Sequence, residues 1–565
     1  MAEPLGYFAL VLHSHIPYVM SHGKWPHGTD WLTESAVETY LPLIDTARRL
    51  ESEGIAANYT INLTPILQEQ LASEAFKAEF VDYLRQNIDA SRADQKAFGQ
   101  DGPLWMAGIA YFWEQFYAQQ MEFYINGLDR DILGEFRRMQ DAGLIEVITS
   151  AATHGYLALL GTDESVFAQT RIGAETYRRN FGRSARGFWL PECSYRPAYE
   201  WSPPVPGIQP TMRQGVEMAL ADSQIDYFFV DTHLLRGGEP TGTYAARFPG
   251  LMKLYEQFRK NFQDQPDRHP YQPYLMFGSG ETHRPVAVFA RDPETTAQVW
   301  SGDMGYPGDA AYLEFHKKHA PSRLRYWRVS DNKADLGAKE AYEPWRAYQQ
   351  IRSHADHFVT VLKDTLRKHR DRHGRPGILV SMYDTELFGH WWFEGPEWVY
   401  EAIKRIANDP EIEMVSCGAY LDRFPPKERV VLPEGSWGEG GYHYVWLNKD
   451  TAWVWERIYR AEAQFLDLKE KCANNEAAQP YLQQLARELL LLQSSDWPFL
   501  ITTWSARDYA EIRINDHFRR FEGIASLIDK VLMNERPTEA ELALFAESRE
   551  RDPVFDPIDL NAWSS

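Results

Sequence analysis

Short apolar runs alternate along the chain with longer segments in which apolar residues recur three and four positions apart. The short runs predict β-strands at 7–12, 57–63, 145–150, 186–190, 226–230, 286–290, 377–382 and 413–416. The longer segments predict helices at 34–53, 73–96, 111–142, 170–180 and 346–369. This alternation is typical of a parallel α/β architecture, and it predicts a TIM-like (β/α) barrel of seven or eight strands.

Polar side chains follow almost every predicted strand. They are His13, His15, Asn62, Thr64, Thr153, His154, Glu192, Asp231, His233, Arg291, Asp292, Asp384 and Glu386. Loops are exposed to solvent and usually polar, so a single polar residue after a strand is weak evidence of a functional site. In a barrel of parallel strands, however, the carboxyl ends meet at one mouth, where active sites are built. The recurrence therefore predicts a polar site at the mouth.

Three segments depart from the alternation. Residues 201–221 open with a turn-rich stretch and continue as a short helix, which predicts a small inserted helical subdomain. Residues 236–282 are rich in Gly, Pro and Tyr and predict a lid-like excursion over the mouth. After residue 416 the strand pattern stops, and helices are predicted at 451–474, 477–492, 506–533 and 539–549. We therefore expect a barrel domain at 1–429 and a helical domain at 430–565.

The composition narrows the choice of partner. Among 565 residues, 59 Lys and Arg stand against 80 Asp and Glu, a net charge of −21. An acidic surface repels phosphate backbones and anionic lipids, so we expect neither nucleic acid nor a membrane as partner. No apolar stretch is long enough to span a membrane. Three cysteines without Cys-x-x-Cys spacing and an N-terminal region without a basic leader predict a cytoplasmic protein.

Two carboxylates stand out by their surroundings. Glu192 follows an apolar strand that ends in Leu190-Pro191, and Asp384 ends another buried strand beside a Gly- and aromatic-rich turn. Two such groups facing each other across a barrel mouth are the equipment of glycoside chemistry, in which one attacks or activates water and the other donates a proton. The alternative is that each caps or pairs with a neighbouring helix.

The pair His13 and His15 has two interpretations. Strand positions i and i+2 point to the same face, so both imidazoles can enter the mouth together. They could bind a metal, as in barrels that open with His-x-His, but those sites need a bridging lysine or its substitute and further histidines. Here the fourth strand ends in Glu192 instead. We favour histidines that hydrogen-bond a substrate or orient the carboxylates, with no metal and no cofactor.

Four segments in order resemble the signature motifs of glycoside hydrolase family 57. They are His13-Ser14-His15-Ile16-Pro17-Tyr18, Ala152-Thr153-His154-Gly155-Tyr156, Trp189-Leu190-Pro191-Glu192-Cys193 and Tyr383-Asp384-Thr385-Glu386-Leu387-Phe388-Gly389-His390-Trp391. Within the family they look closest to the 1,4-α-glucan (glycogen) branching subgroup. The resemblance spans nearly the whole chain and implies an incomplete (β/α)7 barrel with a helical C-terminal domain that completes a glucan cleft.

The resemblance also implies roles for single residues. Glu192 matches the nucleophile and Asp384 the acid/base of a retaining double displacement. The implied substrate-binding residues are His13, His15, His154, Tyr244, Arg291, Trp300, Trp437, Trp446 and Asp496. Tyr244 falls where the subgroup carries a loop tyrosine, although the sequence departs there with an apparent insertion at 254–273. The tryptophans could equally be core residues, because Trp is usually well buried.

The implied activity is cleavage of α-1,4 linkages of a linear glucan and transfer of the segment to a C6 hydroxyl, which forms α-1,6 branches. The expected partner is an α-1,4-glucan such as amylose or a glycogen-like polymer, and the expected state is a monomer or small homo-oligomer. An α-amylase or 4-α-glucanotransferase of the same family would use the same carboxylates. A metal-dependent hydrolase and a non-catalytic glucan-binding protein remain as further alternatives.

Overall fold

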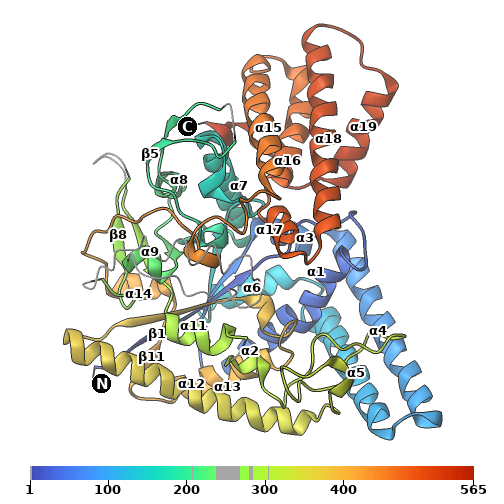
Figure 1. Ribbon diagram of the computed structural model, residues 1–565, viewed down its shortest axis with the longest axis vertical. Coiled ribbons are helices and arrows are strands. Elements are labelled where there is room, and N and C mark those ends of the chain that lie inside the picture. The colour runs from blue at the N-terminus through green and yellow to red at the C-terminus, as the bar shows by residue number, and fades with distance from the viewer. Residues whose placement is uncertain (1–2, 206–207, 237–267, 279–283, 303, 565) are drawn as a thin grey trace.

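The computed structural model describes residues 3–205, 208–236, 268–278, 284–302 and 304–564. A curled, mostly parallel sheet forms its centre (Figure 1). Within the described ranges, seven parallel strands follow one another in the order β10-β1-β2-β3-β4-β7-β9. Their bounds are β1 Gly6–Ser14, β2 Thr60–Leu63, β3 Glu146–Ser150, β4 Gly187–Trp189, β7 Tyr227–Val230, β9 Val286–Ala290 and β10 Ile378–Asp384.

All eight predicted strands are present. The sequence left open whether the barrel has seven or eight strands, and the eighth predicted strand is an addition outside the barrel path. It is β11 (Ile412–Met414), which pairs with the start of β1 and lies off the path of the seven. A further strand, β8 (Tyr274–Met276), pairs antiparallel with β9 and is not predicted by the pattern. The prediction of an incomplete seven-stranded barrel is therefore confirmed, with two additional short strands, one beside the start of β1 and one beside β9.

The two outer strands of the seven approach each other without forming a ladder. The backbone N–H of Asp292, just after β9, donates to the carbonyl of Val380 in β10 at 2.8 Å. The Ser381 hydroxyl donates to that of Thr295, and the Tyr383 hydroxyl donates to the carbonyl of Thr295. Side chains and the start of helix α11 thus bridge a seam that strand pairing leaves open.

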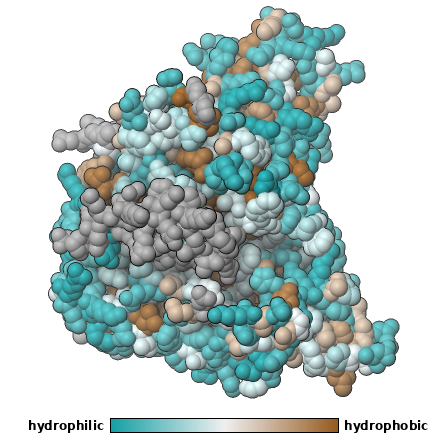
Figure 2. Space-filling view, in the orientation of Figure 1, coloured by the Kyte–Doolittle hydropathy of each residue, from teal (hydrophilic) through white to brown (hydrophobic). Residues whose placement is uncertain are grey.

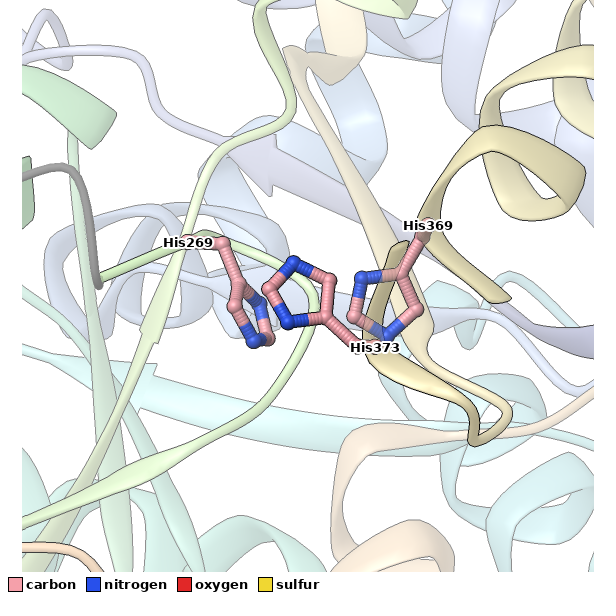
Figure 3. A group of neighbouring side chains, drawn as sticks. All are labelled: His269, His369 and His373. Carbon is pink, nitrogen blue, oxygen red and sulfur yellow. The ribbon is translucent and has the colours of Figure 1, made fainter. Parts of the chain in front are cut away.

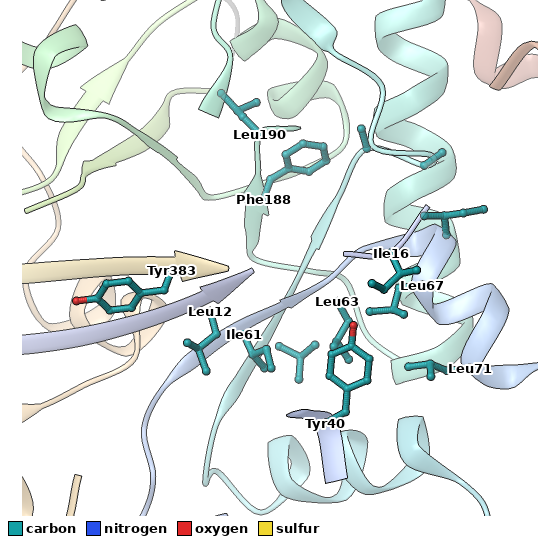
Figure 4. Packing of buried hydrophobic residues seen from close by; sticks show 14 of the residues in the cluster. Leu12, Ile16, Tyr40, Ile61, Leu63, Leu67, Leu71, Phe188, Leu190 and Tyr383 are labelled. Carbon is teal, nitrogen blue, oxygen red and sulfur yellow. The ribbon is translucent and has the colours of Figure 1, made fainter. Parts of the chain in front are cut away.

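Alternation along the strands separates two apolar layers. Tyr7, Ala9 and Val11 belong to one buried cluster, which includes Trp189, Phe229 and Met382 and fills the inside of the sheet. Phe8, Leu10 and Leu12 belong to the cluster that faces the helices; Figure 4 shows part of it, with Leu12, Ile61 and Leu63 in it. Odd positions of β1 therefore point inward, a parity that decides where His13 points.

Helices cover the outside of the sheet. Among the described residues up to 430, they are α1 Thr29–Ser35, α2 Leu41–Ser52, α3 Pro65–Ala72, α4 Glu74–Asp101, α5 Leu104–Glu122, α6 Ile132–Asp141, α7 Asp163–Phe181, α8 Val216–Asp222, α9 Thr232–Arg236, α11 Pro293–Trp300, α12 Pro344–His373, α13 Gly395–Ala407 and α14 Cys417–Arg423. The single helix predicted at 111–142 is two helices, because Asp129 and Arg130 adopt positive φ and Asp131 caps the start of α6.

The insertion after β4 contains more than the predicted helix. A two-stranded antiparallel hairpin, β5 (Tyr199–Trp201) with β6 (Thr211–Arg213), precedes α8. Its short strands expose several side chains and therefore carry little apolar periodicity. Most of the excursion predicted at 236–282 lies outside the described residues, apart from Arg236 and residues 268–278.

The C-terminal part of the chain is helical, as predicted. Figure 1 shows α15 (Ala452–Lys471), α16 (Gln479–Leu492), α18 (Arg507–Leu532) and α19 (Glu539–Arg551) side by side at one end of the molecule. The short helix α17 (Asp496–Thr503), which the pattern does not predict, connects this group to the sheet. Buried among the helices is a hydrogen-bonded polar cluster of Glu488, His517, Arg520 and Asp552.

The outer surface is mainly hydrophilic on the face that Figure 2 shows, and apolar residues are scattered over it. Among the described residues, none of the helices is long and apolar enough to cross a membrane.

Candidate active site

Two neighbouring strands bring His13 and Asp384 to the mouth. They are register partners across the β1–β10 ladder. His13 continues the inward series of Tyr7, Ala9 and Val11, and Asp384 continues that of Ile378, Val380 and Met382, so both side chains point inside the curled sheet. The alternation that builds the core thus also aims these polar groups at its open end.

Glu192 is held in a strained turn after β4. Its φ is 60°, and the next residue, Cys193, has a φ of 48°. Non-glycine residues in this region cost free energy and concentrate at functional sites. The indole N–H of Trp437 donates to Oε2 of Glu192 at 2.8 Å, and the backbone N–H of Trp437 donates to its carbonyl. A residue from the C-terminal side of the chain therefore fixes both ends of Glu192.

Three imidazoles stack against one another beside Glu192. The ring centroids of His15 and His154 are 4.0 Å apart, and those of His13 and His154 are 4.9 Å apart. The ring of His13 also stacks on Trp189, at 4.5 Å with 9° between the planes. Nδ1 of His154 lies 3.9 Å from Oε1 of Glu192. Burial lowers the pKa of His13 and of His154, so both rings are neutral near pH 7.

Residues from the C-terminal region complete the histidine stack. Nε2 of His15 donates to the Asp496 carboxylate at 2.8 Å, and Nδ1 of His154 lies 2.8 Å from the Ser495 hydroxyl. Burial raises the pKa of Asp496, but the neighbouring His15 and the Ser494 hydroxyl more than offset this and hold it below its usual range. Asp496 is therefore ionised and orients His15.

Arg291 approaches the site from β9. It forms a buried ion pair with Asp231, which follows β7, and its guanidinium lies 5.4 Å from the ring centre of Trp437. Burial raises the pKa of Asp231, but Arg291 outweighs this and keeps the carboxylate ionised. Trp437 is thus placed between Arg291 and Trp189, whose ring centre is 5.1 Å away.

The remaining predicted residues lie at different depths. Trp300 is half-buried at the end of α11. Trp446 is only 1% exposed and packs on Tyr156, with 4.7 Å between ring centroids, behind the turn at Gly438. Its packing suits a wall that supports Trp437. Tyr244 lies outside the described residues.

The pKa values of the two carboxyl groups, Glu192 and Asp384, are raised to near neutral pH. Burial raises the pKa of Glu192 to about 8, with repulsion from Asp384 adding to the rise and Trp437 opposing it. Burial raises the pKa of Asp384 to about 7, against the opposing effects of His15 and Arg291. Such a pair titrates in two coupled steps, and near pH 7 to 8 it holds one proton between its members.

Sequence reasoning assigned no role to Glu386, which contributes to the site. It accepts hydrogen bonds from the Tyr40 hydroxyl and from the backbone N–H of His15, at 2.5 and 3.2 Å. Burial raises its pKa to about 8. Its position two residues after Asp384 was the available signal. Ser495 was missed because nothing in its local sequence relates it to His154.

One group of residues here could hold a metal ion. Donor atoms of His15, His154 and Asp496 all lie within 4.8 Å of one another. The Nε2 atom of His15 and the Asp496 carboxylate are engaged with each other, and Nδ1 of His154 is engaged with Ser495. Nε2 of His154 is buried and has no hydrogen-bond partner among the described residues, so His15 and Asp496 are the members whose mutual bond an ion would have to replace.

Two family models match the chain. The model described as glycosyl hydrolase family 57 matches residues 9–433, and the model described as 1,4-alpha-glucan branching enzyme, C-terminal, matches residues 457–563. Together they cover the sheet with its helices and the C-terminal helices.

Three relatives of known name are similar over nearly the whole chain. The 1,4-alpha-glucan branching enzyme of Thermococcus kodakarensis is 40% identical over 562 residues, which are 99% of this chain and 79% of the relative. Its crystal structure superposes with a TM-score of 0.90 at 39% identity, covering 99% of this chain and 97% of that one.

The branching enzyme of Pyrococcus horikoshii has a TM-score of 0.88 at 39% identity, with 99% and 97% of the two chains covered. The α-amylase AmyC of Thermotoga maritima has a TM-score of 0.80 at 25% identity, with 99% of each chain covered.

Proposed function

Because this chain belongs to glycosyl hydrolase family 57 and its C-terminal helices match the branching-enzyme model, we propose that it is a 1,4-α-glucan branching enzyme. It cleaves an α-1,4 linkage of a linear glucan and transfers the released segment to a C6 hydroxyl, which creates an α-1,6 branch. The observation that carries the proposal is the convergence of Glu192 and Asp384 on one buried mouth, with pKa values that leave one proton between them.

We propose that Glu192 is the nucleophile and Asp384 the acid/base. The nucleophile has to be ionised, and the hydrogen bond from the indole of Trp437 stabilises that form. Within the described residues no hydrogen bond to the Asp384 side chain is recorded, which suits a group that has to meet the glycosidic oxygen. Burial is the main cause of the raised pKa of Glu192, and repulsion from an ionised Asp384 adds to it. The free pair therefore holds its proton mainly on Glu192, and the proposed roles require that proton to lie on Asp384 when the glucan is bound, a state in which the repulsion from Asp384 vanishes.

The two steps follow from this distribution of charge. Asp384 protonates the departing 4-oxygen while Glu192 forms an ester with the anomeric carbon. The ester carries no charge, so the pKa of Asp384 falls and the carboxylate can then remove the proton of the incoming 6-hydroxyl. Retention of the anomeric configuration results from the two displacements.

The neighbouring groups position the sugar. The neutral rings of His13 and His154 suit hydrogen bonding to hydroxyls, and the Nδ1–H of His13 donates to Asn62 at 2.7 Å, which leaves its Nε2 as an acceptor. We propose that Trp300 and Trp437 offer apolar faces to the sugar rings and that Arg291 also lines the cleft. Transfer requires that the acceptor be held in place while water is excluded.

We propose that the helical domain from about residue 430 completes this cleft. Support comes from Trp437, which bonds to Glu192, and from Ser495 and Asp496, which bond to His154 and His15. The histidines then act as hydrogen-bonding groups, without a metal ion or another cofactor. Treatment with EDTA is expected to leave the branching rate unchanged, and a loss that added zinc restores equally in the wild type and in His373→Ala, which lacks a histidine far from the mouth, would overturn this part.

The test of the function uses amylose and two readouts. Proton NMR counts new α-1,6 linkages, and a reducing-sugar assay counts new chain ends, for the wild type, Glu192→Gln and the surface control Glu74→Gln. Branching predicts many α-1,6 signals with few new ends for the wild type and the control, and neither for Glu192→Gln.

An α-amylase is the second candidate, favoured by the similarity to AmyC. An α-amylase uses the same carboxylates with water as the acceptor. If the assay finds new chain ends without α-1,6 linkages, the protein is a hydrolase and the branching proposal is refuted. If Glu192→Gln still produces α-1,6 linkages or new chain ends at the wild-type rate, Glu192 is not the nucleophile.

A further inference from the structure

A cluster of three histidines lies away from the candidate active site. His369 and His373 are one turn apart at the end of α12, and His269 lies on the segment that precedes β8. Figure 3 shows the three rings gathered between the two segments. We propose that His269, His369 and His373 form a binding site for one zinc ion or a similar divalent transition metal, which ties this segment to α12.

The geometry suits such an ion. One nitrogen of each ring lies within 4.8 Å of the other two. The ring centroid of His269 is 4.7 Å from that of His369 and 4.3 Å from that of His373. Imidazole nitrogens are preferred ligands of zinc, copper and nickel, and two histidines at i and i+4 present them on one helix face. Three nitrogens leave the fourth position of a tetrahedron for water.

The donor atoms are available. Nδ1 of His369 is buried and has no hydrogen-bond partner among the described residues. Metal ligation requires the neutral ring, and burial lowers the pKa of His269 to about 3 and that of His369 to about 4. Burial lowers the pKa of the partly exposed His373 as well, with Arg372 and Arg375 contributing. The rings are therefore neutral at pH 7, and clustering them costs no charge repulsion.

Two features oppose an ion. The positive charges of Arg372 and Arg375 disfavour a cation, so the affinity has to come from the three nitrogen ligands. Nδ1 of His269 accepts a long 3.3 Å hydrogen bond from the backbone N–H of Tyr271, and the ring has to give this up if the ion binds at Nε2. The backbone of His269 stays fixed meanwhile, because its N–H and carbonyl both bond to the Tyr274 hydroxyl.

The site would brace the open seam of the sheet. Tyr271, two residues after His269, accepts a hydrogen bond from the N–H of Ile378 at the start of β10, and its hydroxyl donates to Asp292 after β9. The ion would therefore sit at the start of β10, whereas Asp384 ends that strand about 20 Å away at about 3.3 Å per residue. The inference is independent of the proposed function.

Zinc chloride tests the site on the full chain without a polyhistidine tag. After dialysis against EDTA and then buffer, zinc is titrated by calorimetry, and bound zinc is counted by mass spectrometry. His373→Ala is the informative variant, because His373 is partly exposed and alanine is a good helix former. His316→Ala, at a histidine whose side chain is 72% exposed, is the matched control, and His154→Ala reports on the group at the mouth.

The expected result is one zinc per chain for the wild type, His316→Ala and His154→Ala, and a rise in Tm that saturates at this ratio. In His373→Ala the affinity should fall more than about 100-fold, because loss of an outer-shell partner alone costs about 10- to 100-fold. Retention of tight zinc by His373→Ala, loss of it in His154→Ala alone, or absence of zinc binding in the wild type would each overturn the proposal.

Discussion

Replacing Trp437 by phenylalanine should move the acidic limb of the pH–activity profile. The substitution removes the indole N–H that donates to Oε2 of Glu192 at 2.8 Å. It keeps an aromatic ring between Arg291 and Trp189, and it keeps the backbone hydrogen bond to the Glu192 carbonyl. The change therefore acts mainly on the charged form of one carboxyl group.

The size of the effect follows from that hydrogen bond. A hydrogen bond to a charged group contributes about 1.5 to 3 kcal/mol, and 1.36 kcal/mol corresponds to about one pH unit. The pKa of Glu192 should therefore rise by about 1 to 2 units. Because the active form needs an ionised Glu192, activity in the variant is lost at higher pH than in the wild type. At pH values well below the acidic limb, kcat/KM of the variant should be about 10- to 100-fold lower than that of the wild type.

The assay measures kcat/KM for transfer on amylose from pH 5 to 9. The wild type should show a bell with its maximum near neutral pH, since the pair loses its protons around pH 7 and 8. Trp345→Phe, an exposed tryptophan on α12, is the control and should reproduce the wild-type curve. A uniform drop at every pH without a shift of the acidic limb would show that Trp437 does not stabilise ionised Glu192.

Three further substitutions test other parts of the structure. Asp384→Asn should lower kcat for cleavage and for transfer by about 100- to 10,000-fold while leaving the circular dichroism unchanged, and selective loss of transfer would contradict an acid/base role. Glu192→Gln should raise Tm above about pH 8 and leave it unchanged below pH 4.5, because a carboxyl whose pKa rises from 4.5 to about 8 on folding makes the native state less stable as pH rises through that window, by at most about 5 kcal/mol. Equal Tm values at pH 8.5 would count against a raised pKa. Arg520→Leu should cost about 3 to 5 kcal/mol in denaturant unfolding, because it breaks a fully buried ion pair with Asp552, 2.7 Å away, and leaves that carboxylate with its hydrogen bond to His22. The exposed neighbour Arg519→Leu is the control, and equal losses in the two variants would refute the argument.

The sheet could be predicted because its signal is local. Each inward strand is an apolar run, and the period of two also predicts that His13 and Asp384 point inside. The hairpin before α8 escaped because its strands are short and partly exposed, and α17 escaped because Ser495 and Asp496 interrupt the apolar pattern. Local propensity predicts segments that bury one face. The hairpin and α17 do not fit that pattern, because contacts with distant parts of the chain position them.

The candidate site was predictable in its carboxylates and histidines but not in their partners. Trp437 was expected at the cleft, yet its hydrogen bond to Glu192 depends on a turn that lies more than two hundred residues further along the chain. The histidine cluster at α12 shows the same limit. The spacing of His369 and His373 is visible in the sequence, whereas the approach of His269 depends on tertiary structure.

The bond between His15 and Asp496 joins residues 481 positions apart, so the mouth cannot be assembled before nearly the whole chain has been synthesised. Closing so long a loop is slow, because its entropy is lost before the contact is gained. The strands and their helices can form earlier as the ribosome releases them, but before α17 is added His15 lacks its bond to Asp496 and His154 lacks its bond to Ser495. Appearance of activity would therefore mark the end of folding, and a chain cut before residue 490 should have a formed sheet without turnover.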